Sequence, residues 1–65
     1  MSKIMTVYFN EDDLLYKICI SGHSAESYVA GKVTGKFELN DEEIARIIKA
    51  GSVDEAFGVL EEERK

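Results

Sequence analysis

The chain has 65 residues and a net charge of −5 at pH 7, and 45% of its residues are hydrophobic and 32% charged, a composition typical of a globular domain rather than a disordered segment. One cysteine and one histidine exclude an internal disulfide and a zinc site of the usual four-ligand kind. A single small domain spanning residues 1–65 buries only about 60% of its unfolded surface, so packing and self-association into a homodimer remain as sources of stability.

The first predicted element is an antiparallel hairpin. Lys3–Phe9 alternates between two side-chain sets, with Tyr8 in one and Phe9 in the other. The polar cluster Asn10–Asp13 suits a turn, and Leu14–Ser21 resumes an alternating β-branched pattern. We therefore expect two strands joined by a four-residue turn.

Residues 22–31 allow two readings. Ser24–Ala30 fits a short helical turn that ends at Gly31, whereas Ser27–Ala30 fits a strand that turns at Gly31. Lys32–Leu39 then alternates again and predicts a third strand, in which Gly35 either weakens the strand or marks a bulge.

Two short helices are predicted after residue 39. Asn40 and Glu43 have the spacing of a capping box, as do Ser52 and Glu55, and Gly51 separates the two segments. Apolar side chains recur at helical spacing in both, at Ile44, Ile47 and Ile48 and at Val53, Ala56, Phe57 and Leu60. The predicted fold class is α+β: an antiparallel sheet of two or three strands with two C-terminal helices packed on one face.

Two segments approach known reactive motifs without completing them. In residues 30–37 three residues separate the glycines instead of four, and Phe37 stands where a phosphate-binding loop has Ser or Thr. Cys19 and His23 lie four residues apart at a strand end, where an extended chain separates them by roughly 13 Å, and no third residue is marked to orient them. We therefore predict no catalytic, cofactor-binding or metal-binding residues.

Val7–Phe9 and Ile18–Ser24 together resemble the opening hairpin of the ribosomal-processing cysteine proteases, whose catalytic histidine follows a glycine after such a strand. The resemblance ends at Ser24, and no cysteine follows His23, although the family places its catalytic cysteine downstream of the histidine. It implies a shared hairpin shape, and no function is transferred from it.

The lone cysteine and the start of the chain bear on location. A single cysteine favours a reducing, cytoplasmic setting, and Met1–Met5 leads into an alternating segment rather than the apolar core of a secretory signal. The apolar runs are far too short to span a membrane.

The negative charge lies in one half of the chain. Residues 1–36 hold four basic and four acidic residues, whereas residues 37–65 hold four basic and nine acidic ones. This imbalance disfavours nucleic acid and favours a protein partner with a basic surface. The acidic residues of the predicted helices include Glu42, Glu43, Asp54 and Glu55. They are equally consistent with a helix face that contacts only water.

The second candidate surface is the sheet face left open by the helices. It would carry Tyr8 or Phe9, Tyr16 or Leu15, and Tyr28, depending on the side to which each strand turns these residues. An exposed aromatic patch on so small a domain usually marks an interface, and an open sheet edge offers another route to pairing. The candidate partner-binding residues are thus Tyr8, Tyr16, Tyr28, Glu42, Glu43, Asp54 and Glu55.

The leading hypothesis is a small cytoplasmic protein-binding module, not an enzyme, that acts stoichiometrically as a regulator or inhibitor of a protein partner. Its size and charge are typical of phage-encoded inhibitors of host machinery, an analogy to viral proteins that rests on no motif. The alternative is a nucleic-acid or small-ligand binding module that uses the lysines of the predicted sheet, Lys3, Lys17, Lys32 and Lys36.

Overall fold

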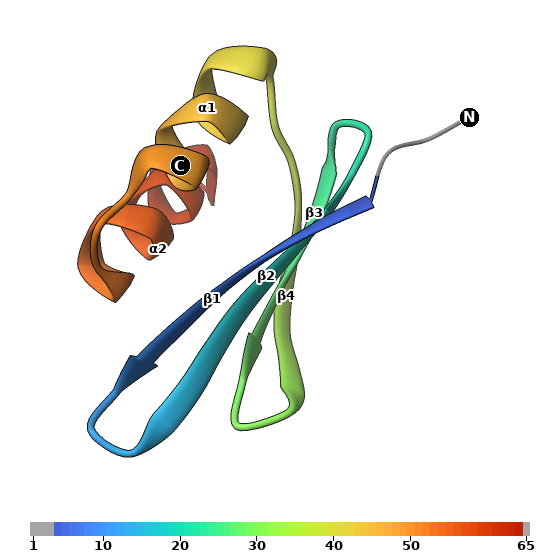
Figure 1. Cartoon of the computed structure of the whole chain (residues 1–65). Helices are drawn as coiled ribbons and strands as arrows, with labels where there is room; N and C mark the ends of the chain where they lie inside the picture. The colour runs from blue at the N-terminus through green and yellow to red at the C-terminus, as the bar shows by residue number, and fades with distance from the viewer. Residues whose placement is uncertain (1–3, 65) are drawn as a thin grey trace.

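Four strands form one antiparallel sheet in which each strand pairs with its neighbours in sequence, in the order β1-β2-β3-β4 (Figure 1). The computed structural model describes the backbone of residues 4–64 and the side chains of residues 4–62. Lys3 therefore lies outside the described residues. The elements are β1 (Ile4–Glu11), β2 (Leu14–Ser21), β3 (Ser24–Val29), β4 (Lys32–Glu38), α1 (Asp41–Lys49) and α2 (Val53–Arg64).

The α+β class and the two helices are confirmed, but the prediction of two or three strands was wrong. The additional strand is β3, where the sequence allowed a helical turn over Ser24–Ala30 or a shorter strand over Ser27–Ala30. This segment pairs on both sides, so that Ala25 faces Ile20 of β2 and Phe37 of β4. Two ladders of backbone hydrogen bonds thus outweigh the weak strand preference of its serine, alanine and glutamate residues.

The three hairpin turns are two-residue turns, and the first and third have left-handed backbone at both central residues, whereas in the β2–β3 turn Gly22 has a φ of 62° and His23 is not left-handed. Asp12 and Asp13 have φ of 53° and 63°, and Ala30 and Gly31 have φ of 53° and 83°. Positive φ at both central positions is the geometry of a type I′ turn, which matches the twist of the flanking strands. The predicted four-residue turn over Asn10–Asp13 was therefore too long, because its first two residues belong to β1.

Helix α1 begins with the predicted capping box. The Asn40 side chain accepts a hydrogen bond from the Glu43 backbone N–H at 2.8 Å, and the Glu43 carboxylate accepts one from the Asn40 N–H at 2.9 Å. At the start of α2 only half of the box forms, since the Glu55 N–H donates to Ser52 Oγ at 3.3 Å while the Glu55 carboxylate accepts from Gly51. These bonds satisfy backbone donors that a helix start leaves unpaired.

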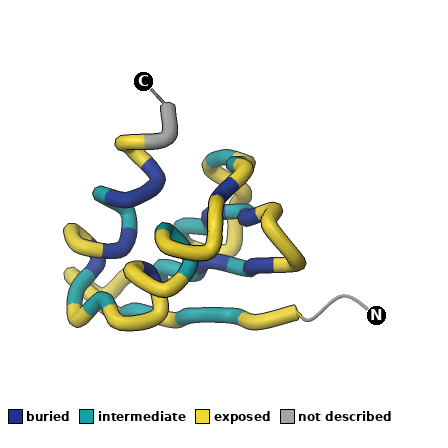
Figure 2. The backbone as a smooth tube through the Cα atoms, turned by 90° about the horizontal axis from the view of Figure 1, so that it is seen from above, coloured by how far each residue is buried: buried dark blue, intermediate teal, exposed yellow. Residues whose placement is uncertain are grey.

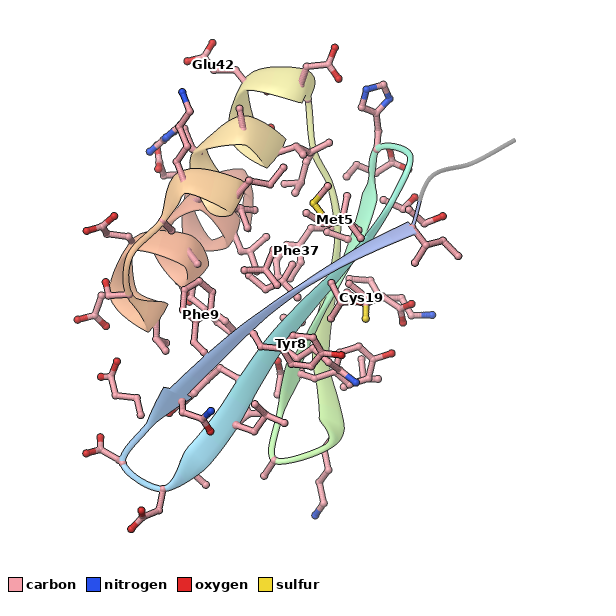
Figure 3. The ribbon with its side chains drawn as sticks, in the orientation of Figure 1. Met5, Tyr8, Phe9, Cys19, Phe37 and Glu42 are labelled. Carbon is pink, nitrogen blue, oxygen red and sulfur yellow. The ribbon has the colours of Figure 1, made fainter. Side chains whose placement is uncertain are left out.

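The core lies between the helices and one face of the sheet, and the buried stretches of the backbone in Figure 2 belong to both layers. Phe9 and Phe37 point toward the helices, whereas Cys19 lies on the opposite face (Figure 3). The buried core residues are Ile18, Ile20, Ala25, Leu39, Ile47, Ala56, Val59 and Leu60. Within residues 4–64, no helix lies over the opposite face of the sheet (Figure 1).

Candidate protein-interaction surface

One row of side chains crosses all four strands on the uncovered face of the sheet. Tyr8 pairs with Lys17, Lys17 with Tyr28, and Tyr28 with Val33. Residues that are direct partners in an antiparallel sheet project to the same face, so the four side chains form a continuous strip. Tyr8 keeps 60% of its surface exposed and Val33 51%.

Lys17 holds the middle of this strip. Its Nζ lies 4.4 Å from the centroid of the Tyr28 ring, within the range of a cation–π contact. Such a contact restrains both long side chains before any partner arrives, which lowers the conformational entropy lost on binding. Lys17 therefore gives the strip one positive charge flanked by aromatic rings.

The rest of the open face is mixed, and the described charges of the whole face, with Lys17 of the strip included, sum to zero. The row next to the strip carries Thr6, Cys19, Glu26 and Lys36, and Thr6 Oγ1 lies 3.6 Å from Cys19 Sγ. Among the residues that the structure describes, the four strands place two lysines and two glutamates on this face, namely Lys17, Lys36, Glu26 and Glu38. Exposed aliphatic side chains extend the apolar area at Ile4 and Leu15, which are 75% and 41% exposed.

Tyr16 lies on the other face of the sheet from Tyr8 and Tyr28. Its ring packs edge-on against Phe57 of α2, with the centroids 5.6 Å apart and the planes at 86°. Of the two options that the sequence left open at each strand, the structure places Tyr8 and Leu15 on the open face and Phe9 and Tyr16 toward the helices. The candidate tyrosines are therefore divided, and Tyr16 contributes to the core instead.

A bulge adds Val33 to the open face. The register shifts between Ser27 and Tyr28, so that Gly35 and Val33 face these two residues and Thr34 is the additional residue. The alternation expected over Lys32–Leu39 would place Val33 on the same side as Phe37, and the bulge places it on the opposite side instead. The sequence allowed a bulge as one of two explanations for Gly35 in this strand. That bulge was the one sequence feature that could have predicted Val33 on the open face.

The acidic helix residues have local structural roles. The Glu43 carboxylate caps α1 and the Glu55 carboxylate accepts from the backbone before α2. Arg46 donates a hydrogen bond to Glu62 at 2.8 Å. This hydrogen bond and the negative charge of Glu62 raise the pKa of Arg46 above its ordinary value, and the negative charge of Glu42 makes a smaller contribution. Asp54 lies in the first turn of α2, where the helix dipole favours a negative charge.

Cys19 and His23 have separate partners. His23 Nε2 lies 2.8 Å from Asp41 Oδ1, joining the β2–β3 turn to the start of α1, whereas Cys19 contacts Thr6 on the open face. Within residues 4–62, no three His, Cys, Asp or Glu side chains are grouped so as to hold a metal ion. The phosphate-loop-like segment, residues 30–37, forms a hairpin turn and most of β4 rather than a loop that leads into a helix.

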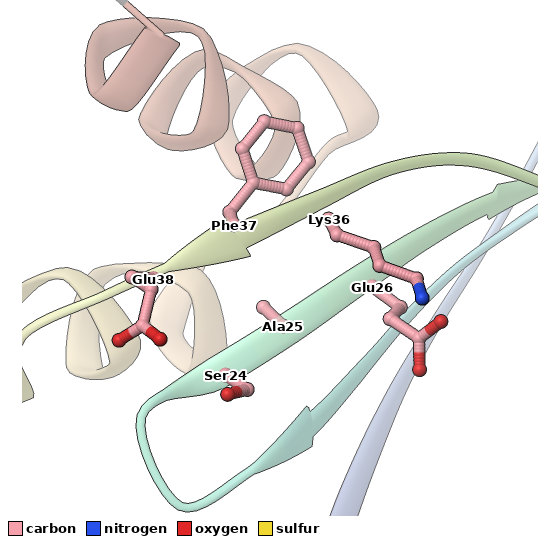
Figure 4. A pocket seen from close by; sticks show the side chains of 6 residues that line it. All are labelled: Ser24, Ala25, Glu26, Lys36, Phe37 and Glu38. Carbon is pink, nitrogen blue, oxygen red and sulfur yellow. The ribbon is translucent and has the colours of Figure 1, made fainter.

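The hollows of the surface are shallow. One of about 410 Å³ follows the β3–β4 edge, where Phe37 points toward a helix and Glu26 and Glu38 point away from it (Figure 4). Another of about 230 Å³ lies where Tyr16, Val29 and Phe37 meet Phe57 of α2. The first is divided between the two faces of the sheet and the second is lined largely by core side chains, so neither gathers polar groups around one point as a ligand site does.

No family model, curated protein sequence or solved structure matches the chain. The resemblance to the processing proteases thus remains one of hairpin shape. Among the described residues, neither helix is long and apolar enough to cross a membrane.

Proposed function

We propose that the chain is a cytoplasmic protein-binding module that acts stoichiometrically, as a regulator or inhibitor, on a protein partner that covers the open sheet face. The observation that carries this proposal is the strip of Tyr8, Lys17, Tyr28 and Val33 on the open face, in which Tyr8 and Val33 are exposed and Lys17 and Tyr28 are half-buried. Tyrosine is enriched among residues that dominate binding energy, because its ring buries a large apolar area while its hydroxyl keeps a polar partner.

The open face supports this function better than the acidic helix surface. Glu43, Glu55 and Glu62 each accept a hydrogen bond within the chain, so a partner would compete with existing contacts. Tyr8 is mostly exposed on the open face, away from the core between sheet and helices. Exposed aromatic side chains that stabilise little in the free protein are better explained by a surface that a partner covers.

The composition of the strip defines the partner's chemistry. The charges on the open face cancel, so association there depends on apolar and aromatic contact more than on long-range attraction. Lys17 in the middle favours a partner that places a carboxylate or carbonyl oxygen among apolar side chains. We therefore propose a largely apolar protein surface with one such acceptor.

The test is capture of partners from a bacterial lysate by the wild-type chain and by the double variant Tyr8→Thr, Tyr28→Thr. Threonine keeps the strand preference while removing both rings. The matched control is Glu42→Gln, Asp54→Asn, which alters the helix layer and leaves the strip intact. A protein retained by the wild type and the control but lost by the tyrosine variant supports the proposal. Loss with the control alone, or no specific partner at all, contradicts it.

Nucleic acid is the second candidate, favoured by the same two rings. Exposed aromatic side chains on a sheet beside lysines are the platform on which single-stranded nucleic acids stack. The lysines are, however, divided, since Lys17 and Lys36 share the open face with Glu26 whereas Lys32 pairs with Val29 on the other side. A mobility shift that weakens steeply with salt and is lost with the tyrosine variant would favour this candidate over a protein partner.

A further inference from the structure

The two edges of the sheet differ in how they are protected. β4 is interrupted by its bulge and exposes the charged residues Lys32, Lys36 and Glu38, features by which proteins discourage pairing at an edge. β1 has neither protection. It pairs with β2 over all eight residues without a register shift, and its one charged side chain is Glu11 at the end.

The hairpin geometry identifies the backbone groups that β1 leaves outside. Glu11 and Leu14 flank the two-residue turn, and in such a hairpin the flanking pair exchanges hydrogen bonds. Hydrogen-bonded pairs then alternate along the ladder, so that odd-numbered residues of β1 bond to β2. The N–H and C=O groups of Thr6, Tyr8 and Asn10 consequently point away from the sheet.

The core is also incomplete along β1. On the helix side of β2, Ile18 is 0% exposed and Ile20 is 4% exposed. Their partners in β1 are less buried, since Val7 is half-buried and Met5 is 42% exposed. Burial thus falls off toward this edge. A strand added beside β1 would cover the apolar side chains there and satisfy the outward backbone groups.

We infer that a second copy of this chain supplies that strand, with the two β1 strands antiparallel about a two-fold axis at Val7. In this register Met5 of each copy faces Phe9 of the other, so the helix-side row of the interface is wholly apolar, and Thr6 faces Tyr8 on the open face. The neighbouring register, with Tyr8 on the axis, sets Glu11 against Met5. The apolar pattern therefore selects the first register.

Charge placement permits this self-association despite the net charge of −5. The acidic turn residues Asp12 and Asp13 lie at one end of β1, and antiparallel pairing sends the two turns to opposite ends of the interface. At about 3.4 Å per residue, the ten positions between the two Asp12 residues place them roughly 34 Å apart, several times the Debye length of about 8 Å at physiological salt. The interface uses the backbone of the β1 edge and its helix-side row, whereas the proposed partner contacts the open face, and Tyr8 is the side chain that lies at both.

Disulfide trapping tests this dimer in the full chain. In a Cys19→Ser background, Val7→Cys places two thiols opposite each other at a non-hydrogen-bonded pair, where the Cα atoms lie about 4.5 Å apart, within disulfide range. Tyr8→Cys is the matched control, because its symmetry mate is a diagonal neighbour some 7–8 Å away. We expect covalent dimers from Val7→Cys to form at least about tenfold faster than from Tyr8→Cys. Equal rates, or the reverse order, would overturn the proposal.

Light scattering on the wild type and on Thr6→Pro gives an independent readout. Proline at position 6 removes an outward N–H and leaves the ladder to β2 intact, so it blocks only the free edge. We expect twice the chain mass for the wild type and the chain mass for the variant. A monomeric wild type refutes the dimer. If a lysate protein is then captured by the wild type and lost with Thr6→Pro, that protein and not a second copy of the chain pairs with the edge of β1. Neither result bears on Tyr28, which lies in β3, two strands away from this edge, and reports on the open face alone.

Discussion

The two faces of the sheet are built from the same four strands but bear different side chains. Toward the helices lie core residues that are almost fully enclosed, such as Ile18 at 0% and Ala25 at 1% exposure, beside the half-buried rings of Phe9, Tyr16 and Phe37. On the other face lie Tyr8 and Tyr28 with Lys17 between them. We expect the helix side to account for most of the stability and the open side, where Tyr8 keeps 60% of its surface exposed, to contribute less. This division suggests that the open face is kept for contact with another molecule.

The largest effect is expected from truncating the helix side. Ile18→Ala should lower the free energy of unfolding by about 3 kcal/mol, because the site is enclosed and cannot collapse fully around the cavity. Urea denaturation measures this loss. Val33→Ala on the open face, at 51% exposure, should change it by less than about 0.5 kcal/mol. Similar losses for the two variants would remove the distinction between the faces.

The tyrosines provide a matched pair across the sheet. Tyr16→Thr removes the edge-on contact with Phe57 and should cost about 2 kcal/mol, combining lost burial with the aromatic pair. Tyr28→Thr, in the adjacent strand but on the open side, should cost less than half as much. Thermal unfolding of both variants distinguishes them, and a larger loss at Tyr28 would show that its ring supports the fold.

Helix α1 covers part of the core face of the sheet, and its start is fixed by the capping box at Asn40. Asn40→Ala removes the side chain that accepts from the Glu43 N–H and should cost about 1 kcal/mol. Asn10→Ala, which changes an exposed asparagine at the end of β1, is the control and should be close to neutral. Calorimetry of the two variants checks the difference, and an equal shift in melting temperature would refute the assigned role of the cap.

The smallest change in stability is expected at Tyr8. Tyr8→Thr should alter the free energy of unfolding by less than about 0.5 kcal/mol, since the ring is 60% exposed and threonine preserves the strand preference. The same change should weaken binding of the captured partner at least about tenfold, as expected for an exposed tyrosine that a partner buries. Calorimetric titration measures the affinity. A large loss of stability with unchanged affinity would reverse the roles assigned to the two faces.

The sequence predicted the elements whose signals are local. The alternation in residues 3–9 and 14–21 indicated the first hairpin, and Asn40 with Glu43 indicated the start of α1 through a capping box that forms as expected. Each of these signals acts within a few residues and does not depend on distant neighbours.

The features that were missed depend on pairing between strands. β3 is a strand because β2 and β4 lie on either side of it, although its own residues have a weak preference for strand. The bulge at Thr34 turns Val33 to the open face, and alternation alone cannot place an additional residue. Tyr16 was a candidate for binding because the sequence could not show which side of β2 the helices cover.

The most direct test of the open-face account is to add the captured partner to the isotope-labelled chain and follow the side-chain resonances by NMR. We expect the ring signals of Tyr8 and Tyr28 to shift or broaden at stoichiometric partner, while the carboxylate signals of Glu42 and Asp54 remain unchanged. If the two carboxylates respond and the two rings do not, the partner binds the acidic helices and the open face is not its site.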